Sequence, residues 1–429
     1  MDFQQTLEYL YNLEHFGISL GLENISQLTA AFANPQDQLP IVHVAGSNGK
    51  GSTISFLKDL AREAGLKVGV YTSPHLRHFS ERIVVDGNPI TEEEIVSLTR
   101  ELKPVAESIP RIVTFFDFTT AMALIHFYRC RPDLVILETG LGGTLDATNV
   151  VASPLLTIIT NIALEHEEYL GNTLLAVAGE KAGILKKRTP LISGVRNRRI
   201  RDFLEGRNRT LGGTTFFLGR DFRLRKKNDG FFSYLGLTKR IPQLHLRMLG
   251  DYQKENAALA LCALELLQNQ GLLSINDDQV RKALEKSHWP ARLEKIGEQP
   301  DFYVDGAHNP HGVRALEPVL RQLAEGRRLI LVIGAMKDKR VEAMVSRLAP
   351  LAAEVIVTRA QLDRSCSTEQ LYVAVKKFCP EVFRTETIAE AVELARGRAG
   401  VHDLVFLTGS LYCVGEALQL MDNGGKNKK

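Results

Sequence analysis

The sequence predicts an α/β protein of two units, each a mostly parallel sheet covered by helices. Three observations support this class: apolar runs of strand length alternate with stretches of helical periodicity, a glycine-rich turn follows the first buried strand, and the alternation restarts after Pro290. Such alternation is typical of parallel sheets covered on both faces. We predict a larger N-terminal unit over residues 1–295, a smaller C-terminal unit over 296–422 and a disordered tail over 423–429.

The elements of the N-terminal unit follow from the spacing of apolar residues. Helices are expected over 4–16 and 51–64, where apolar residues recur at helical intervals. A further helix begins after Thr91, which can form a capping box with Glu94. Buried strands are expected at IVHVAG from Ile41, KVGVYT from Lys67, DLVILE from Asp133 and LLTIIT from Leu155.

The C-terminal unit repeats this pattern. Four segments are each expected to form a buried strand: DFYVD, RRLILVIG, AEVIVT and DLVFLTGS. Helices are expected between them, over 312–324 and 388–396. The boundary between the units is predicted within 289–300, where the periodicity lapses and prolines cluster.

Composition excludes several classes of protein. The 429 residues are 44% hydrophobic and 24% charged, with a net charge of only +3, which argues against nucleic acid as the main partner. The basic stretch 196–209 lacks interleaved aromatic residues, so we expect a solvated helix face there. No segment resembles a signal peptide, and no apolar run approaches the ~20 residues that span a bilayer. The five scattered cysteines indicate reduced thiols and a cytoplasmic location.

The stretch VAGSNGKGST, Val44–Thr53, lies between a predicted strand and a predicted helix. Glycines let backbone N–H groups approach phosphate oxygens, and a helix N-terminus favours negative charge. Lys50 would contact the outer phosphates. The pattern departs from G-x-x-x-x-G-K-[ST] at Val44 and Gly51, and the alternative is a glycine-rich turn that binds nothing. The predicted nucleotide-binding residues are Gly46, Ser47, Asn48, Gly49, Lys50, Gly51 and Ser52.

An acidic and an imidazole side chain follow two of the predicted strands. Glu138 ends DLVILE, and His166 lies just past LLTIIT. Open α/β sheets bind ligands at the carboxyl ends of their strands. Mg²⁺, which accompanies ATP, prefers oxygen ligands such as the carboxylate of Glu138. His166 is a less usual ligand for Mg²⁺, and a structural histidine is an equally good interpretation of it.

Two further segments carry polar residues in suggestive settings. Lys181 in AGEKAGI is flanked by alanines and glycines that permit close packing, although a helical lysine is usually solvated. DGAHNP, Asp305–Pro310, directly follows a predicted strand. Asp305 could hold a ribose hydroxyl and His308 could face a nucleotide. The same segment also suits a helix start with Asn309 as the cap, and both interpretations can hold together.

Taken in order, the motifs resemble those of the folylpolyglutamate synthases and dihydrofolate synthases of the Mur ligase superfamily. The resemblance covers nearly the whole chain. The segments that carry it are YLYNLEHFGISLGLENI, HVAGSNGKGST, YTSPHLRHFSERI, ETGLGGTLDATN, LEHEEYLGNT, EKAGI, GDYQKENAALAL, WPARLE, DGAHNPHG and TGSLY.

This resemblance implies an N-terminal P-loop ATPase domain, a C-terminal Rossmann-like domain, and ATP with two Mg²⁺ ions as cofactors. It implies that Ser73 and Glu138 ligate one Mg²⁺ and His166 the other. Lys181 is expected to be carboxylated, which would convert a cation into a carbamate that faces the metal. The residues expected to carry catalysis are Lys50, His166 and Lys181.

The resemblance also assigns binding residues. Asn256, Arg292 and Asp305 match nucleotide contacts of the family. Phe116 and the segment Leu145, Asp146 and Ala147 fall where dihydropteroate binds in its bifunctional members.

The implied activity is the ATP-dependent joining of L-glutamate to dihydropteroate and to reduced folates through an acyl phosphate. The alternatives are a folylpolyglutamate synthase alone, a peptidoglycan Mur ligase, which is disfavoured because Gly51 follows Lys50 where threonine is usual, and an ATP-binding module without catalysis. A monomer is expected.

Five positions depart from the family pattern. Thr144 stands where arginine is expected in LGGRLDATN, which bears on substrate preference because it removes a cation beside the pterin and phosphate region. The other four are Ser47 for threonine, Glu165 for aspartate, Tyr252 for histidine and Ala291 for glycine.

Overall fold

The computed structural model of the protein describes residues 1–13, 21–227 and 230–426. Its contacts divide the chain into two compact units. The first comprises Met1–Arg247 and Gln253–His288, and the second comprises Met248–Tyr252 and the chain from Trp289 onward. The division at Trp289 falls inside the boundary segment expected from the sequence.

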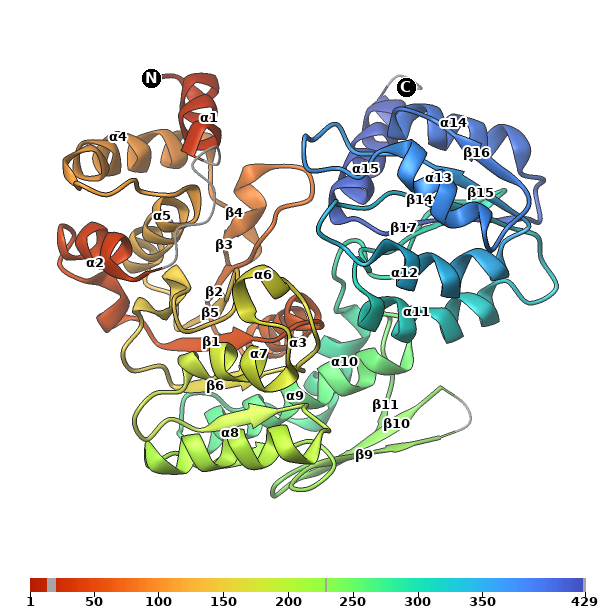
Figure 1. The fold of residues 1–429 in the computed structure, drawn as a ribbon. Helices are drawn as coiled ribbons and strands as arrows, with labels where there is room; N and C mark the ends of the chain where they lie inside the picture. The colour runs from red at the N-terminus through yellow and green to blue at the C-terminus, as the bar shows by residue number, and fades with distance from the viewer. Residues whose placement is uncertain (14–20, 228–229, 427–429) are drawn as a thin grey trace. The chain divides into compact units, whose positions relative to one another are not determined.

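An eight-stranded, mostly parallel sheet forms the centre of the first unit, in the order β4-β3-β2-β5-β1-β6-β7-β8 (Figure 1). Strands β2, β5, β1, β6, β7 and β8 are parallel, and only the edge strands β3 and β4 run antiparallel. The bounds are β1 Ile41–Ala45, β2 Val68–Tyr71, β3 Ile83–Val85, β4 Asn88–Pro89, β5 Leu134–Glu138, β6 Leu156–Ile159, β7 Leu191–Ser193 and β8 Thr215–Phe217. The expected parallel sheet is therefore confirmed, and its central strands are buried throughout.

Several helices of the first unit begin at a side-chain cap, among them α1, α4, α5, α7, α8 and α10. Thr91 accepts a hydrogen bond from the N–H of Glu94 and forms the predicted capping box at the start of α4. The expected helix over 4–16 ends at Asn12, and residues 14–16 lie outside the described residues. The bounds are α1 Phe3–Asn12, α2 Glu23–Ala30, α3 Lys50–Glu63, α4 Glu92–Ser108, α5 Phe115–Cys130, α6 Glu167–Leu170, α7 Leu174–Lys181, α8 Arg198–Thr210, α9 Asp251–Asn269 and α10 Asp277–Lys286.

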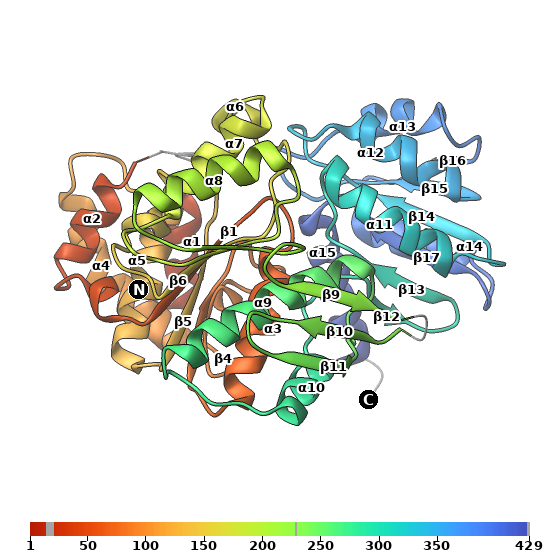
Figure 2. The ribbon, with the colours of Figure 1, turned by 90° about the horizontal axis from the view of Figure 1, so that it is seen from below.

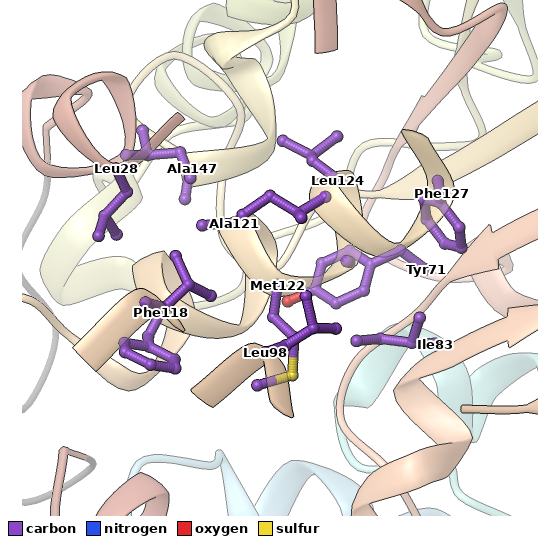
Figure 3. Packing of buried hydrophobic residues seen from close by; sticks show 14 of the residues in the cluster. Leu28, Tyr71, Ile83, Leu98, Phe118, Ala121, Met122, Leu124, Phe127 and Ala147 are labelled. Atoms are coloured by element: carbon purple, nitrogen blue, oxygen red, sulfur yellow. The ribbon is translucent and has the colours of Figure 1, made fainter. Parts of the chain in front are cut away.

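Helix α5 packs against the sheet with almost its whole surface buried. Its side chains form a core cluster with β2, β3 and the neighbouring helices (Figure 3). In this view Met122 and Phe127 lie beside Tyr71 of β2 and Ile83 of β3. The hydroxyl of Tyr71 lies 3.0 Å from Thr119 Oγ1. This packing fixes the helix whose first turn carries Phe116.

A three-stranded antiparallel sheet, which the sequence did not reveal, belongs to the same unit (Figure 2). Its strands are β9 Arg223–Lys226, β10 Phe232–Leu235 and β11 Arg240–Leu244. Glu265 of α9 anchors it, because this buried carboxylate accepts hydrogen bonds from Tyr234 and from the backbone N–H groups of Leu237, Thr238 and Lys239. Helix α8 buries Ile200, Leu204 and Asn208 and exposes four of its five arginines, in line with the solvated face expected for it. The fifth, Arg201, is half-buried.

The second unit contains a six-stranded sheet in the order β12-β13-β17-β14-β15-β16, parallel except for β12. The strands are β12 Glu294–Gly297, β13 Asp301–Val304, β14 Leu329–Ile333, β15 Glu354–Val357, β16 Val382–Arg384 and β17 Leu404–Thr408. The helices are α11 Pro310–Leu323, α12 Val341–Leu348, α13 Thr368–Lys376, α14 Ile388–Arg398 and α15 Leu411–Lys426.

The expected disordered tail, 423–429, requires a correction at its start. Helix α15 continues to Lys426, so residues 423–426 are helical. Residues 427–429 lie outside the described residues. None of the described helices combines the length and the apolar character needed to cross a bilayer.

Candidate active site

Four adjacent parallel strands of the first unit place the predicted residues at one edge of the sheet. The order β2-β5-β1-β6 brings Ser73, Glu138, the glycine-rich turn and the segment after Ile159 to neighbouring carboxyl ends. The register pairs Val44 of β1 with Glu138 of β5. Because ligands bind at this edge of open α/β sheets, the topology itself assembles a candidate site.

The turn Gly46–Gly49 is held by the segment that follows β6. The backbone N–H of Asn48 donates to Asn161 Oδ1 at 2.9 Å, and Ser47 Oγ donates to the carbonyl of Ala163 at 3.1 Å. Gly49 has a φ of 84°, and a Cβ there would lie 2.4 Å from Asn256 Oδ1, so only glycine fits this position. The turn is thus fixed from β6 and from α9 before any ligand arrives.

Lys50 and Glu138 lie close together beside this turn. Lys50 Nζ donates to the carbonyl of Gly46 at 2.9 Å and lies 3.9 Å from Glu138 Oε1. The backbone N–H of Ser73 donates to the other carboxylate oxygen, Oε2, at 3.3 Å. The Glu138 side chain is almost fully buried, so its charge is concentrated at the end of the turn. The structure therefore brings three predicted residues together.

Lys181 is buried, as its small neighbours predicted, and is only 2% exposed. Its Nζ forms an ion pair with Glu165 Oε1 at 2.7 Å. Burial lowers the pKa of the Lys181 ammonium, and Glu165 opposes this shift. Burial alone would raise the pKa of the Glu165 carboxyl, but Lys181 and Lys50 together lower it to about 2. Both side chains of this pair are therefore ionised. The sequence predicted no partner for Lys181, and Glu165 stood out there only as a departure from aspartate.

His166 is the neighbour of Glu165 and serves as the N-cap residue of α6. Its φ of 45° is uncommon for a residue with a side chain. Backbone strain of this kind is concentrated at functional sites. The structure therefore places His166 next to the ion pair of Lys181, at the carboxyl edge of β6.

The glycine loop after Glu138 lies close to α5 and to the segment of Lys181. A Cβ on Gly140 would lie 2.5 Å from Cζ of Phe116. The backbone N–H and the hydroxyl of Thr144 both donate to the carbonyl of Glu180, at 2.9 Å and 3.1 Å. Thr144 thus connects the loop to the residue before Lys181, and no cation stands at that position.

The three residues of the predicted substrate segment differ in their exposure to solvent. Leu145 is 40% exposed, whereas Asp146 and Ala147 are buried. The carboxylate of Asp146 accepts hydrogen bonds from the N–H of Leu141 at 2.7 Å and the N–H of Thr148 at 3.0 Å. Burial raises the pKa of Asp146, while these hydrogen bonds oppose the shift. Asp146 therefore holds the loop in shape.

The second unit contains the other predicted nucleotide residues. The buried carboxylate of Asp305 accepts from the N–H of Leu293 at 2.9 Å and of Ala307 at 2.8 Å. Burial raises the pKa of Asp305, and Arg292 nearby opposes this. His308 Nδ1 lies 2.8 Å from the carbonyl of Gly306. Arg292, Asp305 and His308 therefore lie around one turn. The motif had indicated Asp305 and His308, and the resemblance to the family had added Arg292.

The second unit also has a polar cavity of about 420 Å³ near the carboxyl ends of β14 and β15. Lys337, Arg359, Ser365 and Ser367 are among the residues that line it. The lining also includes the carboxylate of Asp363, so it carries charges of both signs. None of these residues was singled out from the sequence.

The donor set of the first unit fits a magnesium ion that is shared with nucleotide phosphates. Glu138 offers a carboxylate and Ser73 a hydroxyl, which are oxygen ligands of the kind that Mg²⁺ prefers. Among the described residues no group of three or more histidine, cysteine, aspartate or glutamate side chains gathers to hold a metal alone. Mg²⁺ usually binds through one or two carboxylates plus phosphates and water.

Several residues that shape the site were not found from the sequence. Asn161 and Ala163 hold the glycine-rich turn, and Glu165 pairs with Lys181. Only Glu165 gave a signal, as an acid next to a candidate ligand. The others act through contacts more than 110 residues apart in the chain, which local patterns do not reveal.

Comparison with known proteins defines the class. Residues 44–264 match the model of the Mur ligase middle domain, and residues 291–411 match that of the Mur ligase glutamate ligase domain. The chain therefore belongs to the Mur ligase family and is an ATP-dependent glutamate ligase.

Within this family the similar proteins include bifunctional enzymes of folate synthesis. The chain is 34% identical to dihydrofolate synthase/folylpolyglutamate synthase of Bacillus subtilis, over 96% of this chain and 98% of that protein. The Escherichia coli protein of the same name is 30% identical over 98% and 96%. Among solved structures, E. coli FolC in complex with DHPP and ADP has a TM-score of 0.90 at 29% identity and covers 99% of this chain and 98% of its own. Another bifunctional enzyme, with Mn, AMPPNP and L-glutamate bound, has a TM-score of 0.87 at 29% identity, over 97% and 98%.

Proposed function

We propose that this chain joins L-glutamate to dihydropteroate, forming dihydrofolate, and extends reduced folates by further glutamates, with ATP converted to ADP and phosphate. The observation that carries this is the cluster of Lys50, Glu138 and Ser73 beside a glycine-rich turn in a chain of this family. Two relatives that match it over nearly their whole length, those of Bacillus subtilis and Escherichia coli, carry both activities in their names. A third, of Lacticaseibacillus casei, is named folylpolyglutamate synthase alone.

A carboxylate must be activated before an amine can attack it. ATP would transfer its γ-phosphoryl group to the substrate carboxylate and leave an acyl phosphate and ADP. Lys50 would stabilise the charge on the transferring group. The amine of glutamate then attacks the acyl carbon, the phosphate departs and the amine loses a proton. The backbone N–H groups at the start of α3 would bind the phosphates.

The metal ions are assigned to side chains at the same edge. Ser73 and Glu138 would hold one Mg²⁺ and His166 a second. Bound there, the ions would supply electrostatic stabilisation of phosphate charge. The nucleotide contacts proposed beyond the turn are Asn256, Arg292, Asp305 and His308.

Lys181 is proposed to be carboxylated. Reaction with CO₂ needs the neutral amine, and burial shifts the pKa of Lys181 in that direction. In the unmodified form the ammonium pairs with Glu165. Intact-mass spectrometry of the native protein, before and after removal of CO₂, tests this: a gain of about 44 mass units that maps to Lys181 is expected from the added CO₂. Its absence at saturating bicarbonate would contradict the proposal.

The substrate binding residues proposed are Phe116, Leu145, Asp146 and Ala147. The departure at Thr144 bears on the choice between the two substrates. Thr144 uses its hydroxyl on Glu180 and offers no cation to the substrate. A folylpolyglutamate synthase without the first activity is therefore the second candidate.

The test is incorporation of labelled L-glutamate by the purified protein with ATP and Mg²⁺, with dihydropteroate and with tetrahydrofolate in parallel. Product from both supports the bifunctional proposal. Product from tetrahydrofolate alone supports the second candidate. Failure with both, in folded protein that binds ATP, contradicts the ligase and favours an ATP-binding module.

The cellular setting is proposed to be the cytoplasm, with a monomer as the active species. The cysteines of the described chain are free, in keeping with a reducing compartment. Light scattering of the purified protein tests the monomer, since a mass of twice 47.7 kDa would contradict it.

A further inference from the structure

A buried chain of hydrogen bonds connects the strand before the glycine-rich turn to the loop after Glu138. His43 of β1 is fully buried, and its Nε2 lies 2.8 Å from Thr148 Oγ1. The Thr148 hydroxyl in turn donates to Asp146 Oδ1. Residues 43 and 148 are 105 positions apart in sequence. No part of the proposed chemistry uses either of them.

The donor and the acceptor in each of these hydrogen bonds follow from the number of hydrogens that each group carries. A hydroxyl has one hydrogen, and Thr148 gives it to the carboxylate of Asp146. The same oxygen must then accept from His43, so Nε2 of the imidazole carries the hydrogen. His43 Nδ1 is left as a bare acceptor, and it is buried without a hydrogen-bond partner. The imidazole is neutral, because burial lowers the pKa of His43 to about 3.

Asp146 connects these hydrogen bonds to the loop that follows Glu138. Its Oδ2 accepts the N–H of Leu141, and its Oδ1 accepts the N–H of Thr148. The backbone N–H of Asp146 itself donates to the carbonyl of Gly143 at 3.3 Å. Gly143 lies directly over the segment of Lys181, since a Cβ on it would be 3.0 Å from the Lys181 carbonyl oxygen. The chain from His43 therefore ends at the backbone that surrounds Lys181 and presents Leu145.

We propose that His43 is a positioning residue for the pterin-bearing substrate: through Thr148 and Asp146 it sets the conformation of loop 140–147. This rests on the proposed function, because that loop is the proposed substrate segment. His43 touches no reacting atom. Its removal loosens the loop, while the glycine-rich turn keeps its own contacts to Asn161 and Ala163.

Variants of His43 distinguish the effect of the hydrogen-bond donor at Nε2 from the effect of side-chain volume. His43→Gln places an amide N–H at about the position of Nε2 and keeps the hydrogen bond to Thr148, whereas His43→Asn is too short and His43→Phe has no donor. Val42→Ala is the control for lost stability. Val42 is buried on the same strand, with its side chain on the opposite face of the sheet.

Hydrogen exchange of the full-length protein without ligands is the first readout. We expect the amides of residues 140–149 to exchange about tenfold faster in His43→Asn and His43→Phe, the effect of one lost buried hydrogen bond. His43→Gln should match the wild type, and so should Val42→Ala in this segment. Equal exchange in His43→Gln and His43→Asn overturns the proposal, and so does equal loosening by Val42→Ala.

Steady-state kinetics is the second readout. The same loss should raise KM for dihydropteroate, or for tetrahydrofolate if only that is a substrate, by about tenfold and leave KM for ATP within about twofold of wild type. An equal rise in both KM values overturns the positioning role. The exchange readout needs no catalysis, so a wild-type protein without ligase activity would refute the proposed function and leave the role of His43 to be decided by exchange.

A double-variant cycle gives the third readout. Thr148→Val removes the link between His43 and Asp146. If the chain runs through this hydroxyl, His43→Asn adds no further loosening of residues 140–149 in the Thr148→Val background. Additive effects of the two substitutions overturn the proposal.

Discussion

The two units each contain a strand that runs through a polar turn into a helix, and the two turns end differently. In the N-terminal unit, β1 leads through Gly46–Gly49 into α3, which begins at Lys50 with no side-chain cap from the described residues. In the C-terminal unit, β13 leads into α11, where Asn309 accepts the N–H of Gly312 at 2.8 Å. Asp305 accepts two more backbone N–H groups of that region.

The difference shows how one architecture serves two tasks. The first N–H groups of a helix need acceptors, and an anion is a good one. The start of α3 has no side-chain cap among the described residues, while at the start of α11 Asn309 supplies an acceptor. The phosphates of a nucleotide should therefore meet the backbone N–H groups of the first turn and not those of the second.

The largest effect is expected at Lys50. Lys50→Ala removes the cation beside the phosphates, and ATP turnover should fall about 100-fold or more, the usual loss for a group that stabilises transferring charge. Lys58→Ala is the matched control, since Lys58 lies on the same helix and pairs with Asp59. Both variants should melt near the wild-type temperature. Near-wild-type turnover by folded Lys50→Ala would refute the assignment of the turn.

A smaller effect is expected at Gly49. Gly49→Ala strains a φ of 84° and pushes a Cβ onto Asn256, so unfolding free energy should fall by about 1–3 kcal/mol and ATP affinity should fall with it. Gly65→Ala is the control, because Gly65 has a similar φ of 92° with nothing within 4 Å of a Cβ. It should lose stability through strain and keep ATP affinity. Equal ATP affinity in the two variants would contradict the comparison.

These two turns also show what the sequence can predict. Strands such as β1 and β5 are mainly apolar segments followed by glycine or ending in an acid, and caps such as Thr91 and Asn309 are local signals, so both can be recognised from the sequence. The position of the glycine-rich turn, the close packing around Lys181 and the polar turn of Asp305 and His308 after a strand were predicted in this way, whereas Arg292 was named only because of the resemblance to the family.

The remaining features depend on contacts between distant segments. The chain from His43 to Asp146 spans a separation of 105 residues, and the pair of Glu165 and Lys181 needs β6 and α7 to meet. The three-stranded sheet escaped prediction because β9 is mostly exposed and reads RLRK, which hides the two-residue period. Local sequence patterns do not reveal a hydrogen-bond acceptor that another strand provides.

Of the two strands that precede the turns, β1 carries buried His43 and β13 has no histidine. A fall in pH should therefore destabilise the fold through β1 and not through β13. The pKa of His43 is about 3 in the fold against 6.5 when unfolded, through burial and nearby Lys186. Below pH 6.5 His43 is protonated in the unfolded chain but stays neutral in the folded protein. The free energy of unfolding therefore decreases as pH falls from 6.5 toward 3. The slope is about 1.4 kcal/mol per pH unit.

Denaturant unfolding of wild type and His43→Gln between pH 6.5 and 4.5 measures this difference. His43→Gln should remove about that slope, since glutamine takes no proton. Other groups, such as His75, cancel between the two proteins. Parallel pH curves for the two proteins would contradict the assigned shift.

The smallest effect is expected at Asn309. Asn309→Ala removes the cap of α11 and should lower the stability of the second unit by about 1 kcal/mol. Asn309→Ser keeps an acceptor and should lose only part of this. Because the cap serves the helix itself, ATP affinity should stay unchanged. Loss of affinity in Asn309→Ala but not in Asn309→Ser would show that the cap serves the ligand as well.

The central claim is that the uncapped start of α3, and not the capped start of α11, receives the phosphates. The most direct test is hydrogen exchange of the wild-type protein with Mg²⁺ and saturating ADP, compared with saturating adenosine. We predict that ADP, and not adenosine, slows exchange of the amides in residues 46–53, while the amides of 309–313 exchange alike with both ligands. Phosphate-dependent protection of 309–313 without protection of 46–53 would contradict the account.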